Sequence, residues 1–264
     1  MTDQSDDRYL LPRDTGEIDR LDLQHYAFTE ALGALHRAPA RIEGLTLDAG
    51  AGSGRWGWDL VEQSPEAQVI GLDLIAGRPG WPRRYQPLRA NVLDGLPFGD
   101  DSFDFVHQRM MLFSIPARYW HAAIHDLVRV ARPGGWIELV EMPVGGFENT
   151  GPMVDRIAGL ALEAAAGRGL DTSGTPHRLL DQYLRAVGCD DVERVDVALP
   201  VGEWGGRVGS ILATDFRLAS ARILEAFSGL SVEEQAELLR LAHVECEERQ
   251  VTISLAVAFG RKPA

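Results

Sequence analysis

From residue 45 onward, short apolar runs alternate with helix-like segments, and an α/β fold is the architecture that accommodates such an order. The apolar runs carry few charges, which is typical of parallel strands buried on both faces of a sheet. The helical segments between them supply the crossovers that parallel strands require. Strands are predicted at residues 45–49, 68–73, 86–90, 103–107, 136–141, 191–199 and 251–259.

Helices are expected between these strands and at both ends of the set. Helical periodicity or start and stop signals mark residues 55–64, 117–131, 152–166 and 176–187. A further helix begins after Asp14, a capping residue with Glu17 three positions on, and is expected to end at Pro39. We therefore predict an N-terminal helical lid at residues 1–40 and a main domain at residues 41–264. Within that domain, residues of about 202–249 are expected to form a helical insertion that caps the substrate site, with a capping box at Ser231 and Glu234.

Composition excludes several classes of partner. The chain has 264 residues and a net charge of -13, which repels the phosphates of nucleic acids. The one basic cluster, residues 78–84, is predicted to be a solvated loop. Cys189 and Cys246 lack metal-ligand spacing, so we expect free thiols and no bound metal. No signal peptide or membrane-spanning run is recognised, so a cytoplasmic protein without membrane contact is predicted.

The stretch "LDAGAGSG" follows the first predicted strand and precedes a helix. Glycines at such a turn let a ligand approach the main chain and allow positive φ angles. A dinucleotide site has the pattern G-x-G-x-x-G, whereas this turn has Gly50, Gly52 and Gly54 followed by Arg55. Asp48, just upstream, opposes a pyrophosphate and favours a cationic ligand. The pattern therefore favours a cofactor that carries ammonium and sulfonium groups.

Four successive stretches, "LTLDAGAGSG", "VIGLDL", "NVLDGLPFGDDSFDFVHQR" and "ARPGGWIELVE", resemble the motifs of class I S-adenosylmethionine-dependent methyltransferases. The N-terminal "RYLLPRDTGEIDRLDLQH" further resembles the LaeA-like subgroup and bacterial natural-product enzymes similar to the teleocidin C-methyltransferase. The resemblance implies a Rossmann-like, seven-stranded sheet with helices on both faces, an antiparallel last strand and helical cap elements. It also implies S-adenosylmethionine as cofactor and S-adenosylhomocysteine as product.

The resemblance further assigns cofactor contacts. The glycine-rich turn would lie under the methionyl part, with Asp48 near its amino group, and Asp73 would accept hydrogen bonds from both ribose hydroxyls. Two carboxylate oxygens suit that second role. Residues after the second and third strands would flank the adenine, and residues after the fourth strand would lie near the reactive methyl. The full set is Tyr9, Asp48, Gly50, Ala51, Gly52, Gly54, Asp73, Leu74, Asn91, Val92, Gln108 and Arg109.

The expected reaction is methyl transfer to a small molecule at carbon, oxygen or nitrogen, in natural-product biosynthesis. Holding the acceptor in line can supply much of the rate, but an oxygen acceptor would profit from a base. His107, His25 and His177 are the candidate bases, and each can instead be a structural residue. A cofactor-binding regulatory protein and a cyclase with the methyltransferase fold remain alternatives. Homo-oligomerisation through the N-terminal helix is also left open.

Overall fold

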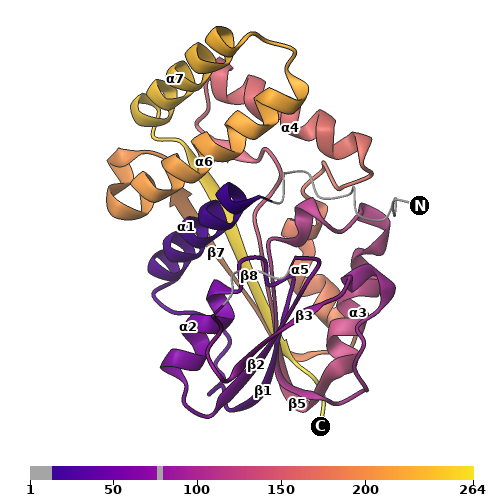
Figure 1. Ribbon diagram of the computed structural model, residues 1–264. Helices are drawn as coiled ribbons and strands as arrows, with labels where there is room; N and C mark the ends of the chain where they lie inside the picture. Colours follow the sequence, from indigo (N-terminus) through magenta and orange to yellow (C-terminus); the bar gives the residue numbers. More distant parts are fainter. Residues whose placement is uncertain (1–13, 76–79) are drawn as a thin grey trace, which may run out of the picture.

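A computed structural model describes residues 14–75 and 80–264, and its centre is a mixed sheet. Five strands run parallel in the spatial order β3-β2-β1-β4-β5, and β8 joins β5 in the antiparallel direction (Figure 1). β7 continues the sheet on the other side of β8. The strands are β1 (Gly44–Ala49), β2 (Ala67–Asp73), β3 (Tyr85–Arg89), β4 (Phe103–Arg109), β5 (Ala131–Glu141), β7 (Asp190–Pro200) and β8 (Thr252–Arg261). The α/β class and the antiparallel last strand are confirmed.

The sheet of the described residues has eight strands rather than the expected seven. The additional strand, β6 (Phe147–Glu148), pairs with the first residues of β8. β8 is long enough for this pairing, because Glu141, the last residue of β5, already lies opposite Ala256. A run of two residues carries no periodicity, so the sequence offered no signal for β6.

The predicted start of a strand at residue 136 is wrong, because β5 starts at Ala131, directly after α3 (Trp120–Val130). Gly134 N–H donates to the carbonyl oxygen of Lys262, and Lys262 N–H donates to that of Gly135. This exchange of hydrogen bonds with the C-terminal segment keeps residues 131–135 extended. β4 is longer than predicted at its carboxyl end. Gln108 and Arg109, which were expected to follow the strand, are its last residues.

Helices cover both faces of the sheet (Figure 1). α2 (Arg55–Gln63) and α1 (Thr15–Leu32) pack on one face, while α3 (Trp120–Val130) and α5 (Thr175–Ala186) pack on the other. Side chains alternate accordingly along β8, where Leu255 and Val257 belong to the first core and Ala256 and Ala258 to the second. The sheet is therefore buried on both sides, as its apolar strands predict.

α1 begins as predicted and ends earlier than predicted. Asp14 accepts a hydrogen bond from Glu17 N–H at 2.9 Å, which caps the first turn. The helix ends at Leu32 because Gly33 adopts a left-handed conformation with φ 70°, so Pro39 lies beyond its end. The chain after the helix is tied to the sheet through Glu138, whose Oε2 accepts from the N–H groups of Arg37 and Ala38.

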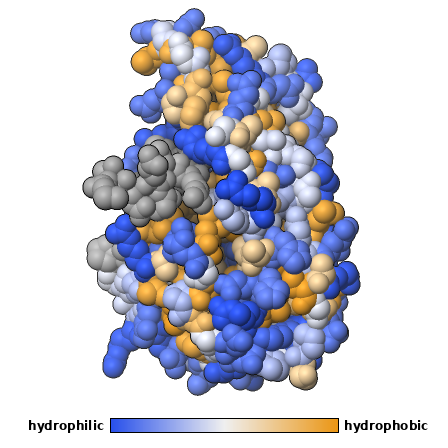
Figure 2. Space-filling view, turned by 90° about the vertical axis from the view of Figure 1, so that its right-hand side faces the viewer, coloured by the Kyte–Doolittle hydropathy of each residue, from blue (hydrophilic) through white to orange (hydrophobic). Residues whose placement is uncertain are grey.

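A helical cap stands over the carboxyl ends of the parallel strands, in the upper part of Figure 1. It consists of α4 (Pro152–Gly167), α6 (Gly206–Phe227) and α7 (Val232–Glu248). The predicted capping box of Ser231 and Glu234 at the start of α7 is confirmed. α1 packs against α6, and Arg20 forms an ion pair of 2.6 Å with Asp215 between these helices. Figure 2 shows apolar side chains reaching the surface in this upper part of the molecule.

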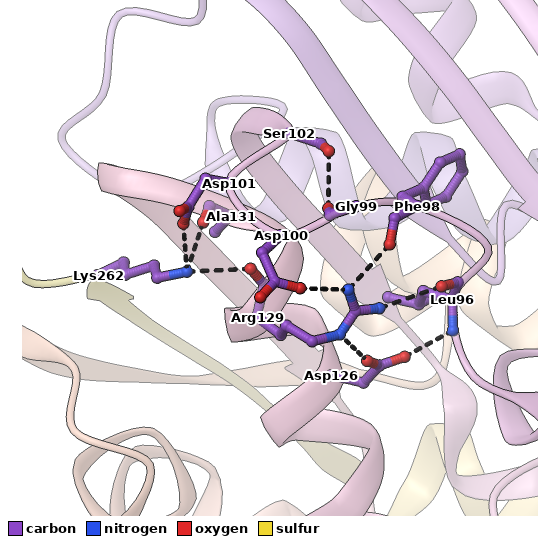
Figure 3. Close-up of polar contacts among 10 residues, drawn as sticks. All are labelled: Leu96, Phe98, Gly99, Asp100, Asp101, Ser102, Asp126, Arg129, Ala131 and Lys262. Atoms are coloured by element: carbon purple, nitrogen blue, oxygen red, sulfur yellow. Dashed lines mark hydrogen bonds and ion pairs between the residues drawn. The ribbon is translucent and has the colours of Figure 1, made fainter.

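At the amino-terminal end of β4, polar contacts around Arg129 hold the preceding loop in place (Figure 3). The guanidinium of Arg129 donates to the carbonyl oxygens of Leu96 and Phe98 and to the carboxylates of Asp100 and Asp126. Lys262 Nζ donates to Asp101 and to the backbone beside Arg129. These bonds hold the loop that leads into β4, so the acids of "FGDDSFDFV" are structural.

In the described part of the basic cluster, Arg84 is half-buried rather than solvated. Its guanidinium donates to the carbonyl oxygens of Ser64, directly after α2, and Ala67, the first residue of β2. Arg78 lies outside the described residues. Among the helices that the structure describes, none combines the length and the apolarity needed to cross a lipid bilayer.

Candidate active site

An open cavity of about 1070 Å³ lies at the carboxyl ends of β1, β2 and β4, where ligands bind in doubly wound sheets. We call it the donor cavity. The turn after β1, the end of β2, the segment after β3 and the end of β4 line it, and α1 closes one side. Of the predicted cofactor residues, it brings together Gly50, Ala51, Gly52, Asp73, Leu74, Asn91, Val92 and Arg109.

The glycines of the turn serve different purposes. Gly50, Gly52 and Gly54 all have positive φ angles, of 78°, 57° and 77°. A Cβ atom on Gly50 would collide with the sulfur of Met111, and one on Gly54 would collide with the rings of Trp81 and Tyr85. A Cβ on Gly52 would meet only Leu21 Cδ1, at 3.2 Å. Gly52 is thus the glycine that keeps the cavity itself open, while Gly54 caps α2 outside the cavity lining.

Asp73 joins the glycine turn to the rim of the cavity. Its Oδ2 accepts from Gly52 N–H at 2.8 Å, and its Oδ1 accepts from Ile75 N–H at 3.0 Å. Burial raises the pKa of this carboxyl, although both backbone donors oppose the shift. Each carboxylate oxygen has further acceptor capacity, so Asp73 can receive additional donors from a ligand.

The segment after β3 forms an apolar wall. Asn91 Oδ1 accepts from Leu93 N–H at 3.0 Å and so caps the short 3₁₀ turn Val92–Asp94. This bond uses one acceptor position of the amide oxygen and leaves its NH₂ group as a donor. Val92 and Leu93 present apolar side chains to the same cavity. A flat, uncharged ring with polar edges suits this wall.

Arg109 is the only arginine that lines the donor cavity among the described residues. Its Nη2 lies 3.3 Å from Nδ1 of His25, and its guanidinium stacks over the ring of Phe28 at 5.5 Å. Within residues 14–75 and 80–264, no carboxylate forms an ion pair with it, and burial lowers its pKa. A half-buried cation on a cavity wall, with no carboxylate paired to it among the described residues, is suited to bind an anionic group.

His25 orients Arg109 and does not line the cavity. Its Nε2 lies 2.9 Å from Oδ2 of Asp59, which also pairs with Arg55 at 2.6 Å. Burial lowers the pKa of His25, so the neutral ring donates from Nε2 to Asp59 and accepts at Nδ1 from Arg109.

The other candidate bases are also placed away from the described cavities. His107 is buried on the face covered by α2, where it contacts Asp48. His177 lies in the first turn of α5, and its carbonyl oxygen accepts from Arg194. Among the residues that the structure describes, no histidine lines the donor cavity, nor a second cavity beside it that is described below.

The remaining predicted cofactor residues lie beside or outside the described site. Asp48 and Gln108 are buried and do not line the donor cavity. The side-chain amide of Gln108 has no hydrogen-bond partner within the described ranges. Tyr9 lies outside the described residues. The described part of the chain also contains no group of three or more His, Cys, Asp or Glu side chains placed to hold a metal ion.

A second cavity of about 950 Å³ adjoins the first, and we call it the acceptor cavity. The two cavities share Leu21, Gln24 and Met110 as lining residues. α1, α4 and α6 supply most of its walls, together with the segment after β5. Its lining is mainly apolar and includes the aromatic side chains of Phe113, Phe147 and Phe216. Arg20 and Asp215, the pair that joins α1 to α6, are its charged residues.

Residues of α1 and its N-cap line the donor cavity, which the sequence analysis did not predict. They are Asp14, Glu17, Leu21 and Gln24, whereas only a helical lid was expected in this region. Glu17, Leu21 and Gln24 are spaced so that they share one helix face. Polar side chains at that spacing beside an apolar stripe were the signal that could have identified them.

Comparison with known proteins places the chain in a family. A model of the methyltransferase domain matches residues 46–135. The methyltransferase str2 of Strobilurus tenacellus is 32% identical over 203 residues, a match that covers 73% of this chain and 71% of that protein. The chain belongs to the class I S-adenosylmethionine-dependent methyltransferases.

This methyltransferase is of the LaeA-like type. The secondary metabolism regulator laeA of Aspergillus fumigatus is 33% identical over 211 residues, which cover 74% of this chain and 54% of the regulator. The chain thus spans about half the length of that relative. Phosphoethanolamine N-methyltransferase 2 of Haemonchus contortus, solved with phosphomonomethylethanolamine and S-adenosylhomocysteine, shares the fold with a TM-score of 0.60 and 16% identity, over 95% of this chain and 58% of that chain.

The donor cavity of the methyltransferase fits its cofactor, S-adenosylmethionine. A methionyl carboxylate requires a cation and ribose hydroxyls require acceptors, and the lining of the cavity contains Arg109 and Asp73. The adenine suits the wall of Leu74, Asn91 and Val92. The same lining includes the acidic side chains of Asp14 and Glu17, which are paired with Arg222 and Arg20.

Proposed function

We propose that this chain transfers the methyl group of S-adenosylmethionine to an apolar small molecule in natural-product biosynthesis. The observation that carries the proposal is the junction of two unlike cavities at Leu21, Gln24 and Met110. The donor cavity has charged ends, whereas the acceptor cavity is mainly apolar. An acceptor in the second cavity would therefore meet the transferable methyl at the shared wall.

The chain's own side chains suffice to bind and orient the cofactor in this proposal. Asp73 accepts from the ribose, Leu74, Asn91 and Val92 hold the adenine, and Arg109 pairs with the methionyl carboxylate. Gly50, Ala51 and Gly52 present the main chain of the turn beneath the methionyl part. Asp48, Gly54 and Gln108 support these residues from outside the cavity lining, and Tyr9 would complete the lid.

Positioning is the main source of rate in this proposal. Methyl transfer from a sulfonium disperses positive charge, so an aligned acceptor in a water-poor cavity needs little acid or base assistance. Among the described residues, the acceptor cavity contains no histidine, and Asp215 is engaged by Arg20 and Gln24. This lining favours acceptors that are nucleophilic without prior deprotonation, such as electron-rich carbon or a neutral amine, over an alcohol.

The acceptor cavity can be tested by filling it. Ala219 lines this cavity on α6, and Ala219→Trp should abolish methylation of apolar acceptors while the affinity for S-adenosylhomocysteine changes less than about twofold. Ala236→Trp, at an exposed position of α7, is the matched control. Product formation would be followed by mass spectrometry with a panel of apolar and charged acceptors of similar size. Equal activity of both variants would show that the acceptor does not bind in this cavity.

The same assay separates the alternative functions. A wild-type chain that binds S-adenosylhomocysteine and methylates no acceptor of the panel would support the regulatory alternative. An acceptor that is rearranged without gaining a methyl group would support the cyclase alternative. A panel in which the charged acceptors alone are methylated would contradict the proposed apolar substrate.

A further inference from the structure

The turn that follows β4 forms the common wall of the two cavities. Met110, Met111 and Ser114 line the donor cavity, and Met110 and Phe113 line the acceptor cavity. The backbone of this turn is a short 3₁₀ helix, Met111–Phe113, closed by hydrogen bonds from Ser114 and Ile115 to the carbonyl oxygen of Met111. Its position therefore determines the shape of both cavities where they meet.

Met110 enters the turn in a conformation that is costly for a residue with a side chain. Its φ and ψ angles are 57° and 42°, in the left-handed region. Such a conformation persists only when surrounding contacts enforce it, and it is found preferentially at functional sites. One contact is the hydrogen bond from Met110 N–H to the carbonyl oxygen of Val140, at 2.9 Å.

Glu141 supplies the other contacts. This residue ends β5, and its side chain is fully buried. Its Oε1 accepts from Met111 N–H at 2.7 Å, and its Oε2 accepts from Leu112 N–H at 3.3 Å. No basic side chain pairs with this carboxyl in the part of the chain that the structure describes, so these two backbone donors are its hydrogen-bond partners.

Met111 connects the turn after β4 to the glycine-rich turn after β1 by direct packing. Its sulfur occupies the space that a Cβ atom on Gly50 would need, so the turn and the glycine loop are packed against each other. A displacement of the turn would therefore displace the loop that lies beneath the methionyl part of the cofactor.

We propose that Glu141 is a positioning residue that holds the Met110–Ser114 wall between donor and acceptor through its two backbone hydrogen bonds. The proposal rests on the proposed function of the donor cavity. It predicts that loss of one carboxylate oxygen weakens cofactor binding although Glu141 does not line either cavity.

Glu138 offers a matched control on the same strand. It is equally buried, and its Oε2 accepts two backbone N–H groups, those of Arg37 and Ala38, both at 2.7 Å. These donors belong to the segment after α1 and not to the wall. Glu138→Gln and Glu141→Gln thus replace buried carboxyl groups of the same strand, and only the second affects the wall. Glu138 bonds through Oε2 alone, since its Oε1 has no partner within the described ranges, so the amide of Glu138→Gln can keep both bonds.

The experiment compares these variants in the full chain. Glu141→Gln should weaken S-adenosylhomocysteine binding about tenfold in calorimetry, the scale of one impaired buried hydrogen bond, while Glu138→Gln should stay within about twofold of wild type. Methyl NMR adds a second readout, because the sequence contains 5 Met residues. The Met110 and Met111 signals should shift or broaden in Glu141→Gln without ligand, and should remain in place in Glu138→Gln.

The outcomes separate the two proposals. A wild-type chain that does not bind S-adenosylhomocysteine would refute the proposed function. Wild-type binding with equal affinities in Glu141→Gln, or with equal losses in both variants, would refute the positioning role alone.

A second pair of variants tests the wall without altering Glu141. Glycine adopts the left-handed conformation without penalty, whereas β-branched valine resists it. Both variants lose the Met110 side chain that lines the cavities, but Met110→Gly should bind S-adenosylhomocysteine at least about fivefold more tightly than Met110→Val. Equal losses would show that the Met110 side chain, and not the held conformation of the turn, determines binding, which would overturn the proposal. This pair also decides the question if Glu141→Gln fails to fold.

Discussion

Asp48 and His107 are direct neighbours across β1 and β4, and Oδ1 of Asp48 lies 2.9 Å from Nδ1 of His107. Both side chains are almost fully buried, and the imidazole stacks on Trp56 with ring centroids 3.8 Å apart. Burial lowers the pKa of His107, so the neutral ring donates its Nδ1–H to the carboxylate. His107 therefore has a structural role, because its hydrogen bond holds Asp48, which lies directly before the glycine-rich turn.

Replacement of His107 should therefore affect stability more than chemistry. His107→Ala leaves Asp48 buried without its donor, and Oδ2 of Asp48 already lacks a partner among the described residues. We expect a loss of about 3 kcal/mol in the free energy of unfolding, measured with urea, with turnover per folded molecule nearly unchanged. His243→Ala, on the exposed face of α7, should cost less than about 0.5 kcal/mol. A stable His107→Ala variant without turnover would instead identify a general base.

Asp73 should determine affinity for the nucleoside part of the cofactor. Asp73→Ala removes the ribose acceptor and also the acceptor of Gly52 N–H, so binding should weaken by about 1 to 3 kcal/mol. Calorimetry should show this loss both for S-adenosylhomocysteine and for 5′-methylthioadenosine, since both contain the ribose. Unchanged affinity for either ligand would show that Asp73 does not bind the ribose.

Arg109 should instead recognise the amino-acid end of the cofactor. Arg109→Met keeps the apolar contact with Phe28 and removes the cation. S-adenosylhomocysteine affinity should fall by about 2 kcal/mol, whereas 5′-methylthioadenosine, which has no carboxylate, should bind as it does to wild type. Equal losses for the two ligands would mean that Arg109 maintains the cavity rather than pairing with a carboxylate.

Arg129 should contribute to stability alone. Its guanidinium bonds two carbonyl oxygens and two carboxylates at the edge far from the donor cavity (Figure 3). Arg129→Met should lower the free energy of unfolding by about 2 kcal/mol and leave S-adenosylhomocysteine affinity intact. Arg240→Met is a fitting control, because its pairing with Glu237 is exposed. Loss of ligand binding at full stability would contradict a purely structural role.

The buried glutamates of β5 should make the protein less stable as pH rises. Burial raises the pKa of Glu138 from 4.5 to about 7 and that of Glu141 from 4.5 to about 8. Between these values the unfolded chain has released protons that the folded chain retains, so the free energy of unfolding decreases with pH. Each group adds a slope of about 1.4 kcal/mol per pH unit. Urea titrations between pH 5 and 7 should show a shallower decline for Glu141→Gln; a profile parallel to wild type would contradict the raised pKa.

The sequence was informative where short-range patterns determine structure. Apolar runs located the long strands, and the glycine turn with Asp73 located the donor cavity, because both features depend on neighbouring residues. The end of α1 shows the limit of such reasoning. Gly33 was a better stop signal than Pro39, since a glycine can take the left-handed conformation that ends the helix.

The lining residues of the acceptor cavity could not be predicted in the same way, although a substrate cap was expected from the inserted helices. Its walls come from α1, α4 and α6, and periodicity does not reveal which faces of distant helices meet. Glu138 and Glu141 lie in a predicted strand, but their hydrogen bonds could not be predicted, because their partners, Ala38 and Met111, lie far away in the sequence. The histidines were favoured for their chemistry, and the structure shows His25 and His107 engaged by Asp59 and Asp48.

The donor cavity is built mainly from the first half of the sheet, whereas α6, which helps to enclose the acceptor cavity, is inserted between β7 and β8. The helices α6 and α7 form one continuous stretch of sequence, so they could be exchanged between homologues without altering the strands that line the donor cavity. α1 lines both cavities, so any exchanged α6 would have to keep contacts with it such as Arg20–Asp215.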